Sequence, residues 1–334
     1  MHLLVTGGLG FIGSNFIHYF NKKSPDIQIT NLDAGFIGSN EKSLEEITPN
    51  KNYRLVWGNI NDKKLVDRLL ESVDGVINFA AETHVDRSIN DPKPFLESNI
   101  MGVYTILDLI KQKNKKIRFI QISTDEVFGS LSSGQAKEKD VFSPSSPYSA
   151  SKASAELIAE SYMKTFGLDI VITRCTNNFG PRQLPEKLIP KTIILALKNM
   201  KIPIYGTGKN IRDWLFVDDH SRAIMEVFLN GKSGDSYNIS TNNELSNIQI
   251  VEKILEILDK PKELIHFVED RPGHDERYSL DSSKLRNELS WKPEKDFEKY
   301  LTETVNWYLT NEKWWKDLAT DEMLDSTPWK KFRS

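Results

Sequence analysis

The sequence has little cysteine, no long apolar run and almost no net charge. Its 334 residues include 44 Lys and Arg against 47 Asp and Glu, for a net charge of −3. Such a balance gives no general attraction to nucleic acid or to an anionic membrane. No apolar run reaches the ~18 residues typical of a membrane span, and residues 1–30 lack a secretory signal pattern. We therefore expect no nucleic-acid partner and no membrane partner.

Cysteine is represented by Cys175 alone, which excludes an intrachain disulfide and most cysteine-based metal sites. This usage fits a reducing compartment, so we expect a cytoplasmic protein. His, Asp and Glu show no cluster with metal-ligand spacing, and we predict that the site holds no metal. The chain is long enough to bury a full hydrophobic core, in one large domain or in two smaller ones.

Short β-rich runs alternate with longer amphipathic stretches through the first half of the chain. This alternation is typical of βαβ units and predicts an α/β fold, a doubly wound parallel sheet of the Rossmann type. Strands are expected at residues 2–6, 27–33, 53–57, 75–80, 118–124 and 170–176. Helices are expected between them, at residues 11–21, 62–72, 94–113 and 147–166.

After Pro181 the chain breaks into shorter segments punctuated by Pro, Gly and Asn, such as residues 237–240. We interpret them as a smaller α/β lobe whose loops close over the carboxyl edge of the sheet, where ligands bind in such folds. The predicted division is 1–180 for the Rossmann domain, with some later segments returning to it, and 181–334 for the smaller lobe and a helical tail. The tail tryptophans are expected to pack in a core or a subunit interface; they are Trp307, Trp314, Trp315 and Trp329.

A glycine-rich turn follows the first expected strand and opens the first expected helix. Gly8, Gly10 and Gly13 fit the spacing G-x-G-x-x-G, which permits a tight turn and close approach of a ligand to the backbone. The free amides at the start of the helix favour a pyrophosphate there. Asp33 lies 20 residues after Gly13, at the end of the second strand, where a carboxylate can bind a ribose 2′-hydroxyl and repel a 2′-phosphate. The turn therefore predicts NAD rather than NADP, with helix capping as the structural alternative for Asp33.

Two proton-handling devices appear in the middle of the chain. Tyr148 and Lys152 are four residues apart in an expected helix and so share one face. A phenol titrates near about 10 and is a poor base at neutral pH until a cation favours the phenolate, as Lys152 and a nicotinamide can. Asp125 and Glu126 directly follow an apolar strand, where burial or mutual repulsion can raise one carboxyl pKa above the other. This acidic pair suits an elimination, and which pKa is raised stays open. The structural alternatives are a surface Tyr/Lys pair and a solvated turn.

These motifs resemble the extended short-chain dehydrogenase/reductase superfamily, and further runs are similar to its dTDP-glucose 4,6-dehydratase family. The glycine turn and Tyr-x-x-x-Lys are common to the superfamily, whereas Thr124-Asp125-Glu126 is typical of the dehydratases within it. Runs that resemble the dehydratases cover most of the chain, at residues 80–88, 124–129, 177–181, 185–190, 211–214 and 271–278.

The resemblance implies an NAD-dependent lyase that acts on dTDP-glucose in deoxysugar nucleotide synthesis. Tyr148, assisted by Lys152, would remove the proton of the sugar 4-hydroxyl as hydride passes from C4 to NAD, with Thr124 hydrogen-bonding nearby. Glu126 would then take the C5 proton, while protonated Asp125 would give its proton to the departing C6 hydroxyl. Return of the hydride to C6 would give the 4-keto-6-deoxy sugar nucleotide.

Binding residues are also implied by the resemblance. The expected cofactor residues are Gly7, Gly10, Phe11, Ile12, Gly13, Asp33, Asn59, Ile60, Ala80, Ala81, Asn99, Tyr148, Lys152 and Asn178. The expected nucleotide-sugar residues are His84, Ser88, Thr124, Asn177, Lys187, Arg212, Asn247, Arg271, His274 and Tyr278. For the cations and amides among them a surface role is the alternative, and for His84 a core role. Members of the family are commonly homodimers built through helices like 94–113 and 147–166, so a homodimer is implied.

The sequence departs from the family pattern in three places. Ala34-Gly35-Phe36-Ile37-Gly38 stands where the family commonly has a Leu-Thr-Tyr-Ala-Gly run, which affects the adenosine side. Asn59 replaces an aspartate that the family places against the adenine, and Phe128 replaces a tyrosine. None of these residues is a proposed proton-transfer group.

Three alternatives stay open. UDP-glucose or CDP-glucose would present the same sugar and diphosphate. A nucleotide-sugar 4-epimerase or a UDP-glucuronate decarboxylase would share the NAD turn and the Tyr/Lys pair, but these enzymes usually lack Asp125-Glu126. A non-catalytic NAD-binding sensor or scaffold would tend to lose Tyr148 or Lys152, and both are present.

Overall fold

The computed structural model describes residues 1–113 and 115–330. Its largest element is a sheet of seven parallel strands in the order β10-β6-β5-β4-β1-β2-β3. The strands are β1 (His2–Thr6), β2 (Gln28–Asp33), β3 (Tyr53–Trp57), β4 (Gly75–Asn78), β5 (Arg118–Thr124), β6 (Ile170–Cys175) and β10 (Ser236–Ile239). The order reverses between β1 and β4, which opens a crevice at the carboxyl edge. The predicted doubly wound parallel sheet is confirmed.

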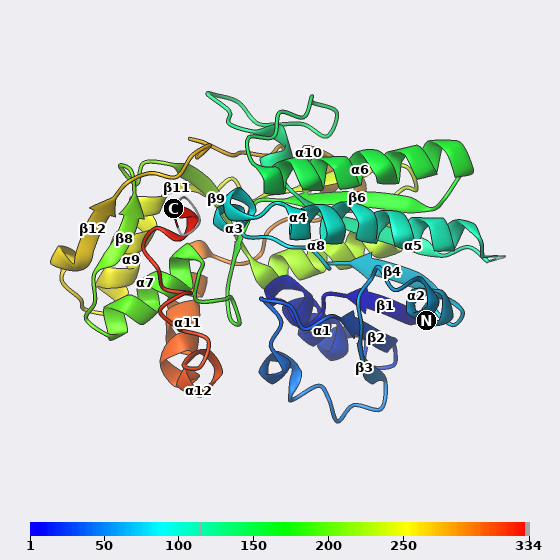
Figure 1. Cartoon of the computed structure of the whole chain (residues 1–334), viewed down its shortest axis with the longest axis horizontal. Helices are drawn as coiled ribbons and strands as arrows, with labels where there is room; N and C mark the ends of the chain where they lie inside the picture. Colours follow the sequence, from blue (N-terminus) through cyan, green and yellow to red (C-terminus); the bar gives the residue numbers. More distant parts are fainter. Residues whose placement is uncertain (114, 331–334) are drawn as a thin grey trace.

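Helices cover both faces of this sheet (Figure 1). Neighbouring residues of a strand point to opposite faces, so Leu3 and Val5 join one core cluster and Leu4 joins the other. One face carries α1 (Phe11–Lys23) and α8 (Val217–Asn230). The other carries α2 (Lys63–Leu70), α5 (Gly102–Lys111) and α6 (Pro147–Phe166).

The second half of the chain adds two small sheets at one end of the large one (Figure 1). Their strands are β7 (Asn177–Phe179), β9 (Ile211–Phe216) and β11 (Glu244–Ser246) in one sheet, and β8 (Ile202–Tyr205) and β12 (Ile265–Val268) in the other. The remaining helices are α3 (Val85–Asn90), α4 (Lys93–Phe95), α7 (Leu188–Leu197), α9 (Asn247–Ile257), α10 (Ser283–Leu289), α11 (Phe297–Thr310) and α12 (Glu312–Trp315). Short turns of other helix types are η1 (Glu41–Leu44), η2 (Leu96–Met101), η3 (Asp125–Phe128), η4 (Lys262–Leu264) and η5 (Pro328–Lys330).

Two sequence expectations were wrong in detail. Residues 237–240 were assigned to the smaller lobe, but β10 pairs with β6 in the large sheet, because Tyr237 and Ile239 are fully buried in the core shared with α8. The single helix expected at residues 94–113 is divided by the π-helical turn η2. Asn99 lies in this wider turn and donates to the Glu82 carbonyl and to Ser151 Oγ. The division of the chain near residue 180 stays a prediction.

The tail tryptophans pack as expected. Trp314, Trp315 and Trp329 are buried, and Trp307 packs against the same core cluster as Trp314. Over the two described ranges, no helix combines the length and the apolar character needed to cross a bilayer.

A buried ion pair holds α6 against β6. Arg174 Nε donates to both Glu156 carboxylate oxygens, at 3.1 and 2.9 Å, and Arg174 Nη2 lies 2.6 Å from Glu156 Oε2. Removal of one partner leaves a buried charge, so we expect Arg174→Met to lower the free energy of unfolding by about 3–5 kcal/mol. Glu156→Leu should cost a similar amount, and the double variant should recover most of the loss. Urea unfolding measures all three; fully additive losses would contradict the account.

Candidate active site

The glycine turn lies between β1 and α1, against the end of β4. At Gly7, where φ is +69°, a Cβ would lie 2.7 Å from the backbone of Ala80, and at Gly13 it would lie 2.5 Å from the Gly7 carbonyl oxygen. Only glycine permits this close packing of backbone on backbone. The N-cap of α1 is Gly10, which has no side chain to cap the helix. The first amides of α1 are therefore left for a bound anion such as a pyrophosphate.

Asp33 is fixed beside this turn by three protein donors. Its Oδ2 accepts from the Leu9 amide at 2.9 Å, and its Oδ1 accepts from the Gly35 amide at 3.0 Å and from Ser39 Oγ at 2.5 Å. An ionised carboxylate has about four acceptor positions, so these donors leave one for a ribose hydroxyl. The geometry is compatible with the expected cofactor role of Asp33.

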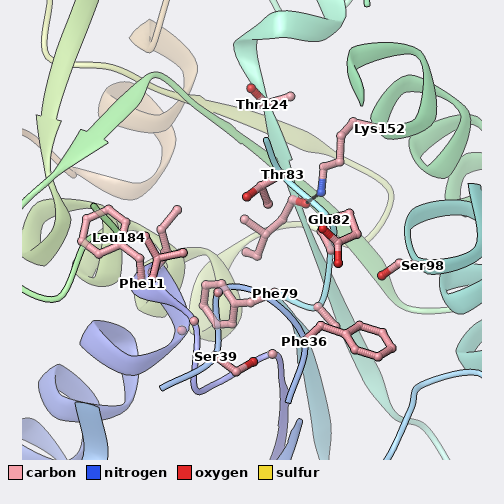
Figure 2. A pocket seen from close by; sticks show the side chains of 18 of the residues that line it. Phe11, Phe36, Ser39, Phe79, Glu82, Thr83, Ser98, Thr124, Lys152 and Leu184 are labelled. Atoms are coloured by element: carbon pink, nitrogen blue, oxygen red, sulfur yellow. Dashed lines mark hydrogen bonds between the residues drawn. The ribbon is translucent and has the colours of Figure 1, made fainter. Parts of the chain in front are cut away.

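A cleft runs along the carboxyl edge from this turn to the acidic pair, and it encloses about 1560 Å³ including space open to solvent. Figure 2 shows Thr124 and Lys152 toward one end and Phe36 and Ser39 toward the other. The expected cofactor residues line the cleft, with the exception of Asn99. Asn99 is buried behind the wall, where its side chain bonds to both the amide and the carbonyl of Glu82. The length and lining of the cleft fit a dinucleotide, and the individual roles stay predictions.

Helix α6 brings Tyr148 and Lys152 to the cleft. A capping box at Ser146 and proline at the first position start the helix at residue 147. Lys152 Nζ donates to the Ile122 carbonyl of β5 at 2.6 Å, and burial lowers the lysine pKa to about 8. Burial and then the charge of Glu126 raise the pKa of Tyr148 well above its ordinary value, while a hydrogen bond with Thr124 acts in the opposite direction. The phenol is therefore protonated at neutral pH until a positive charge is added beside it.

The acidic pair begins η3, directly after β5. Thr124 Oγ1 donates to Asp125 Oδ1 at 3.0 Å and accepts from the Glu126 amide at 3.3 Å. Burial, followed by the neighbouring Glu126, raises the pKa of Asp125 to about 8. Burial also raises the pKa of Glu126, although Arg271, Arg212 and Lys187 oppose that shift. Both pKa values are raised, and Asp125 retains a proton near neutral pH, which suits it to donate one.

Three of the expected substrate cations, Lys187, Arg212 and Arg271, come from distant parts of the chain and favour the charged form of Glu126. Lys187, the N-cap of α7, lines the cleft together with Asn177. Arg212 on β9 stacks 4.2 Å above the centre of the Tyr278 ring, and the Tyr278 hydroxyl donates to Asp275 Oδ2 at 2.5 Å. These cations concentrate positive charge in a chain that is slightly negative overall.

Of the expected substrate residues, Thr124, Asn177 and Lys187 line the cleft, and the others are not among its lining residues. His84 is the buried N-cap of α3, and its Nδ1 has no partner within the described part of the chain. Ser88 Oγ accepts from the Tyr148 amide at 3.2 Å and so supports the start of α6. Burial lowers the pKa of His274 to about 4, and its Nδ1 contacts Asp270 Oδ1 at 2.6 Å. Asn247 begins α9 and is partly exposed. The binding roles of these residues stay predictions.

Several charged residues beside the site were missed from the sequence. Arg87 Nη1 donates to Glu186 Oε2 at 2.7 Å, and Arg87 Nη2 lies 3.7 Å from Glu82 Oε2. Asp86 Oδ1 accepts from Nη1 of Arg271, an expected substrate residue, at 2.9 Å. Glu82, Asp86, Arg87 and Glu186 all lie inside the runs that resemble the dehydratases. Because buried charges require partners, the charges within these runs could have indicated ion pairs beside the site. Within residues 1–113 and 115–330, no group of three or more His, Cys, Asp or Glu side chains could hold a metal ion.

The sheet order, the glycine turn and the Tyr148/Lys152 pair define an enzyme of the dinucleotide-binding Rossmann class. The family model described as GDP-mannose 4,6 dehydratase matches residues 4–304. The chain belongs to this family.

Relatives and solved structures agree over nearly the whole chain. A dTDP-glucose 4,6-dehydratase of Streptomyces niveus is 43% identical and covers 98% of both chains. The crystal structure of dTDP-glucose 4,6-dehydratase from Bacillus anthracis in complex with NAD superposes with a TM-score of 0.90 at 44% identity, covering 95% of this chain and 99% of that one. The enzyme of Streptomyces venezuelae, also with NAD bound, gives a TM-score of 0.93 at 41% identity, covering 95% and 100%.

The raised pKa of Asp125 predicts a cost to stability that depends on pH. Between the ordinary value of about 4 and the folded value of about 8, the folded protein keeps a proton that the unfolded chain has lost, so stability falls as pH rises through this window. Asp125→Asn loses no proton. It should exceed the parent in stability by on the order of a few kcal/mol at about pH 8, and by less toward about pH 4.

Thermal unfolding midpoints of the parent and of Asp125→Asn across this pH range measure the difference. Asp321→Asn, at an exposed position, is the matched control and should follow the parent at every pH. A constant difference between parent and Asp125→Asn would contradict the assigned protonation of Asp125.

Proposed function

We propose that this chain is an NAD-dependent dTDP-glucose 4,6-dehydratase, a hydro-lyase that forms dTDP-4-keto-6-deoxyglucose and water for deoxysugar nucleotide synthesis. The observation that carries the proposal is the pair of buried Asp125 and partly buried Glu126, set beside Tyr148 and Lys152 with Asp125 protonated near neutral pH. A Tyr/Lys pair alone serves oxidation and reduction of an alcohol. A second acid and base beside it are what an elimination requires. The activity printed for the relatives supports the same substrate.

The cleft suits NAD by its own residues. The first amides of α1 would hold the pyrophosphate, Asp33 would bind the adenosine ribose, and Tyr148 and Lys152 would lie on the nicotinamide side. When bound, NAD supplies the acceptor for a hydride and later its donor, and its positive charge favours the Tyr148 phenolate against the effect of burial.

The chain's own residues then divide the proton transfers among them. Tyr148 takes the proton of the sugar 4-hydroxyl during oxidation at C4, and the 4-ketone so formed acidifies the C5 proton. Glu126 takes this C5 proton, helped by cations that favour its charged form. Asp125 gives its proton to the 6-hydroxyl, which leaves as water. Glu126 can return a proton to C5 as C6 is reduced.

The cations around the acidic pair suit the substrate diphosphate. Lys187, Arg212 and Arg271 come from three separate segments, and each favours the charged form of Glu126. Their side chains are largely buried, so charge attraction to a diphosphate is screened less than at the surface. A diphosphate bound here would place the attached sugar beside the acidic pair.

We further propose a cytoplasmic homodimer that buries the outer surface of η2, α5 and α6. Leu96 and Met101 on η2 and Leu157 and Phe166 on α6 are each about half exposed, which is unusual for large apolar side chains. The single cysteine supports a reducing location.

Product formation from nucleotide sugars tests the activity. Purified protein is incubated separately with dTDP-, UDP- and CDP-glucose, and the 4-keto product is followed without added NAD. Turnover is expected with dTDP-glucose. A preference for UDP- or CDP-glucose would change only the nucleotide base assigned to the substrate. Absence of product from all three, with added NAD failing to restore it, would overturn the dehydratase proposal. Tyr148→Phe is the control that should abolish oxidation at C4.

Replacement of each acidic group separates oxidation from elimination. Glu126→Gln should still oxidise C4, seen as NADH absorbance, and then stall, with turnover lowered on the order of 10²- to 10⁴-fold because the C5 proton has no base. Asp125→Asn should also stall, but Glu126 remains able to exchange the C5 proton with deuterated solvent. Mass spectrometry of recovered substrate therefore distinguishes the two variants. Normal turnover, or C5 exchange in Glu126→Gln, would remove Glu126 from the role of base.

A further inference from the structure

The last described part of the chain, residues 311–330, crosses from the cofactor side of the cleft to the substrate side, and we call it the C-terminal strap. It begins with α12 and ends with η5, beyond the residues 4–304 that the family model matches. Figure 1 shows the strap rising from α12, and η5 lies beside α3.

On the cofactor side the strap contacts η1, which follows the cleft-lining residues 36–39. Trp314 Nε1 donates to Ser43 Oγ at 3.2 Å. Lys42 Nζ donates to the Lys313 carbonyl at 3.3 Å and to Asp317 Oδ2 at 3.0 Å. One end of the strap is thus fixed to the loop beside Asp33.

On the substrate side the strap is fixed to three elements. Asn90 Nδ2, at the end of α3, donates to the Pro328 carbonyl at 2.7 Å. Lys191 Nζ, one turn after Lys187 on α7, donates to the Asp325 carbonyl at 3.0 Å. Lys330 pairs with Glu269, just after β12. These contacts surround Trp329, whose side chain is fully buried.

Trp329 is connected to Arg271, a cation of the site, through contacts with Tyr205 and Asp86. Its ring lies edge-on to that of Tyr205, with the ring centres 4.6 Å apart. The Tyr205 hydroxyl donates to Asp86 Oδ2 at 3.1 Å, and Asp86 Oδ1 accepts from Arg271 Nη1 at 2.9 Å. Both oxygens of this buried carboxylate are therefore held, one by Tyr205 and one by Arg271.

Arg271 has a side-chain donor without a hydrogen-bond partner in the described part of the chain. Its Nε is buried and has no hydrogen-bond partner within residues 1–113 and 115–330, and its charge acts on Glu126. A guanidinium with one nitrogen fixed by Asp86 and another unpartnered is oriented before the ligand arrives. Such preorganisation matters because small misplacement of a binding group weakens binding strongly.

We propose that Trp329 is a positioning residue for the nucleotide sugar: through Tyr205 and Asp86 it fixes the direction of Arg271, so that the C-terminal strap completes the substrate wall. The inference rests on the proposed function insofar as Arg271 is taken to bind the substrate diphosphate. Trp329 itself contacts no reacting atom.

Steady-state kinetics separates positioning from mere stability. Trp329→Ala should raise KM for dTDP-glucose by about tenfold or more, with a much smaller change in kcat, because Arg271 is misdirected while the acidic pair keeps its hydrogen bonds with Thr124. Trp329→Phe keeps an aromatic edge against Tyr205 and should restore most of the KM. Trp315→Ala is the matched control: it removes another buried tryptophan of the strap, whose Nε1 donates to the Tyr308 carbonyl, and should lower thermal stability without raising KM.

Hydrogen exchange measured by mass spectrometry gives a readout that needs no turnover. Trp329→Ala should exchange faster than the parent at residues 85–90 and 269–278, and Trp315→Ala should not. If the parent acts on no nucleotide sugar, the proposed function fails while this measurement still decides whether the strap holds those segments. Asn90→Ala, which removes one strap contact and leaves Trp329 in place, covers the case in which Trp329→Ala does not fold, and should show the same two effects more weakly.

An unchanged KM and unchanged exchange in Trp329→Ala would overturn the proposal. So would an equal rise in KM in Trp315→Ala, or a failure of Trp329→Phe to recover, since either would reduce the effect to general destabilisation.

Discussion

Burial of ionisable groups at the carboxyl edge of the main sheet determines what this site can do. Asp125, Tyr148 and Lys152 are buried and Glu126 is partly buried, and burial is the first cause of the pKa shift in each. In every case burial favours the neutral form. Near neutral pH the carboxyl of Asp125 and the phenol of Tyr148 are therefore protonated, and the lowered pKa of Lys152 makes its ammonium group easier to deprotonate. A ligand that adds positive charge beside the phenol changes its protonation without any movement of the backbone.

The positive side of the site comes from the second half of the chain and opposes this tendency more at Glu126 than at Asp125. Arg271, Arg212 and Lys187 favour the charged form of Glu126, whereas Arg212 favours that of Asp125 and the neighbouring Glu126 charge opposes it. Two adjacent carboxyls thus receive different environments although both follow the same strand. This difference in environment is a property of the assembled protein, because neither residue could acquire it from its local sequence alone.

Much of the fold was predictable because its strands and the glycine turn are local features. β1, β3 and β5 lie where the apolar runs place them, and α6 begins at Pro147 and ends at Phe166 as expected. What local pattern cannot supply is pairing across long separations. β10 joins the large sheet after an excursion through the smaller sheets, and η2 widens a helix around Asn99, whose partner Glu82 is distant in sequence.

The candidate site shows the same limit. Residue types and spacing indicated the acidic pair and the Tyr/Lys pair, whereas the partners that orient the cations became visible only in three dimensions. Asp86 and Glu186 were overlooked because a charge next to a recognisable motif residue reads as solvent-facing until its burial is known. Once buried, Asp86 needs Arg271, and Glu186 needs Arg87.

The C-terminal strap bears on the chemistry, although it is distant in sequence, because it supports a buried charge. A buried carboxylate such as Asp86 requires its hydrogen-bond donors to stay in place, and one of those donors, Tyr205, is backed by Trp329. Loss of that support would leave Asp86 with Arg271 as its main partner. The Asp86 carboxylate could then shift, and the Arg271 guanidinium would shift with it, away from the substrate. Affinity for an anionic ligand then depends on apolar packing at the end of the chain, because packing fixes where the charge points.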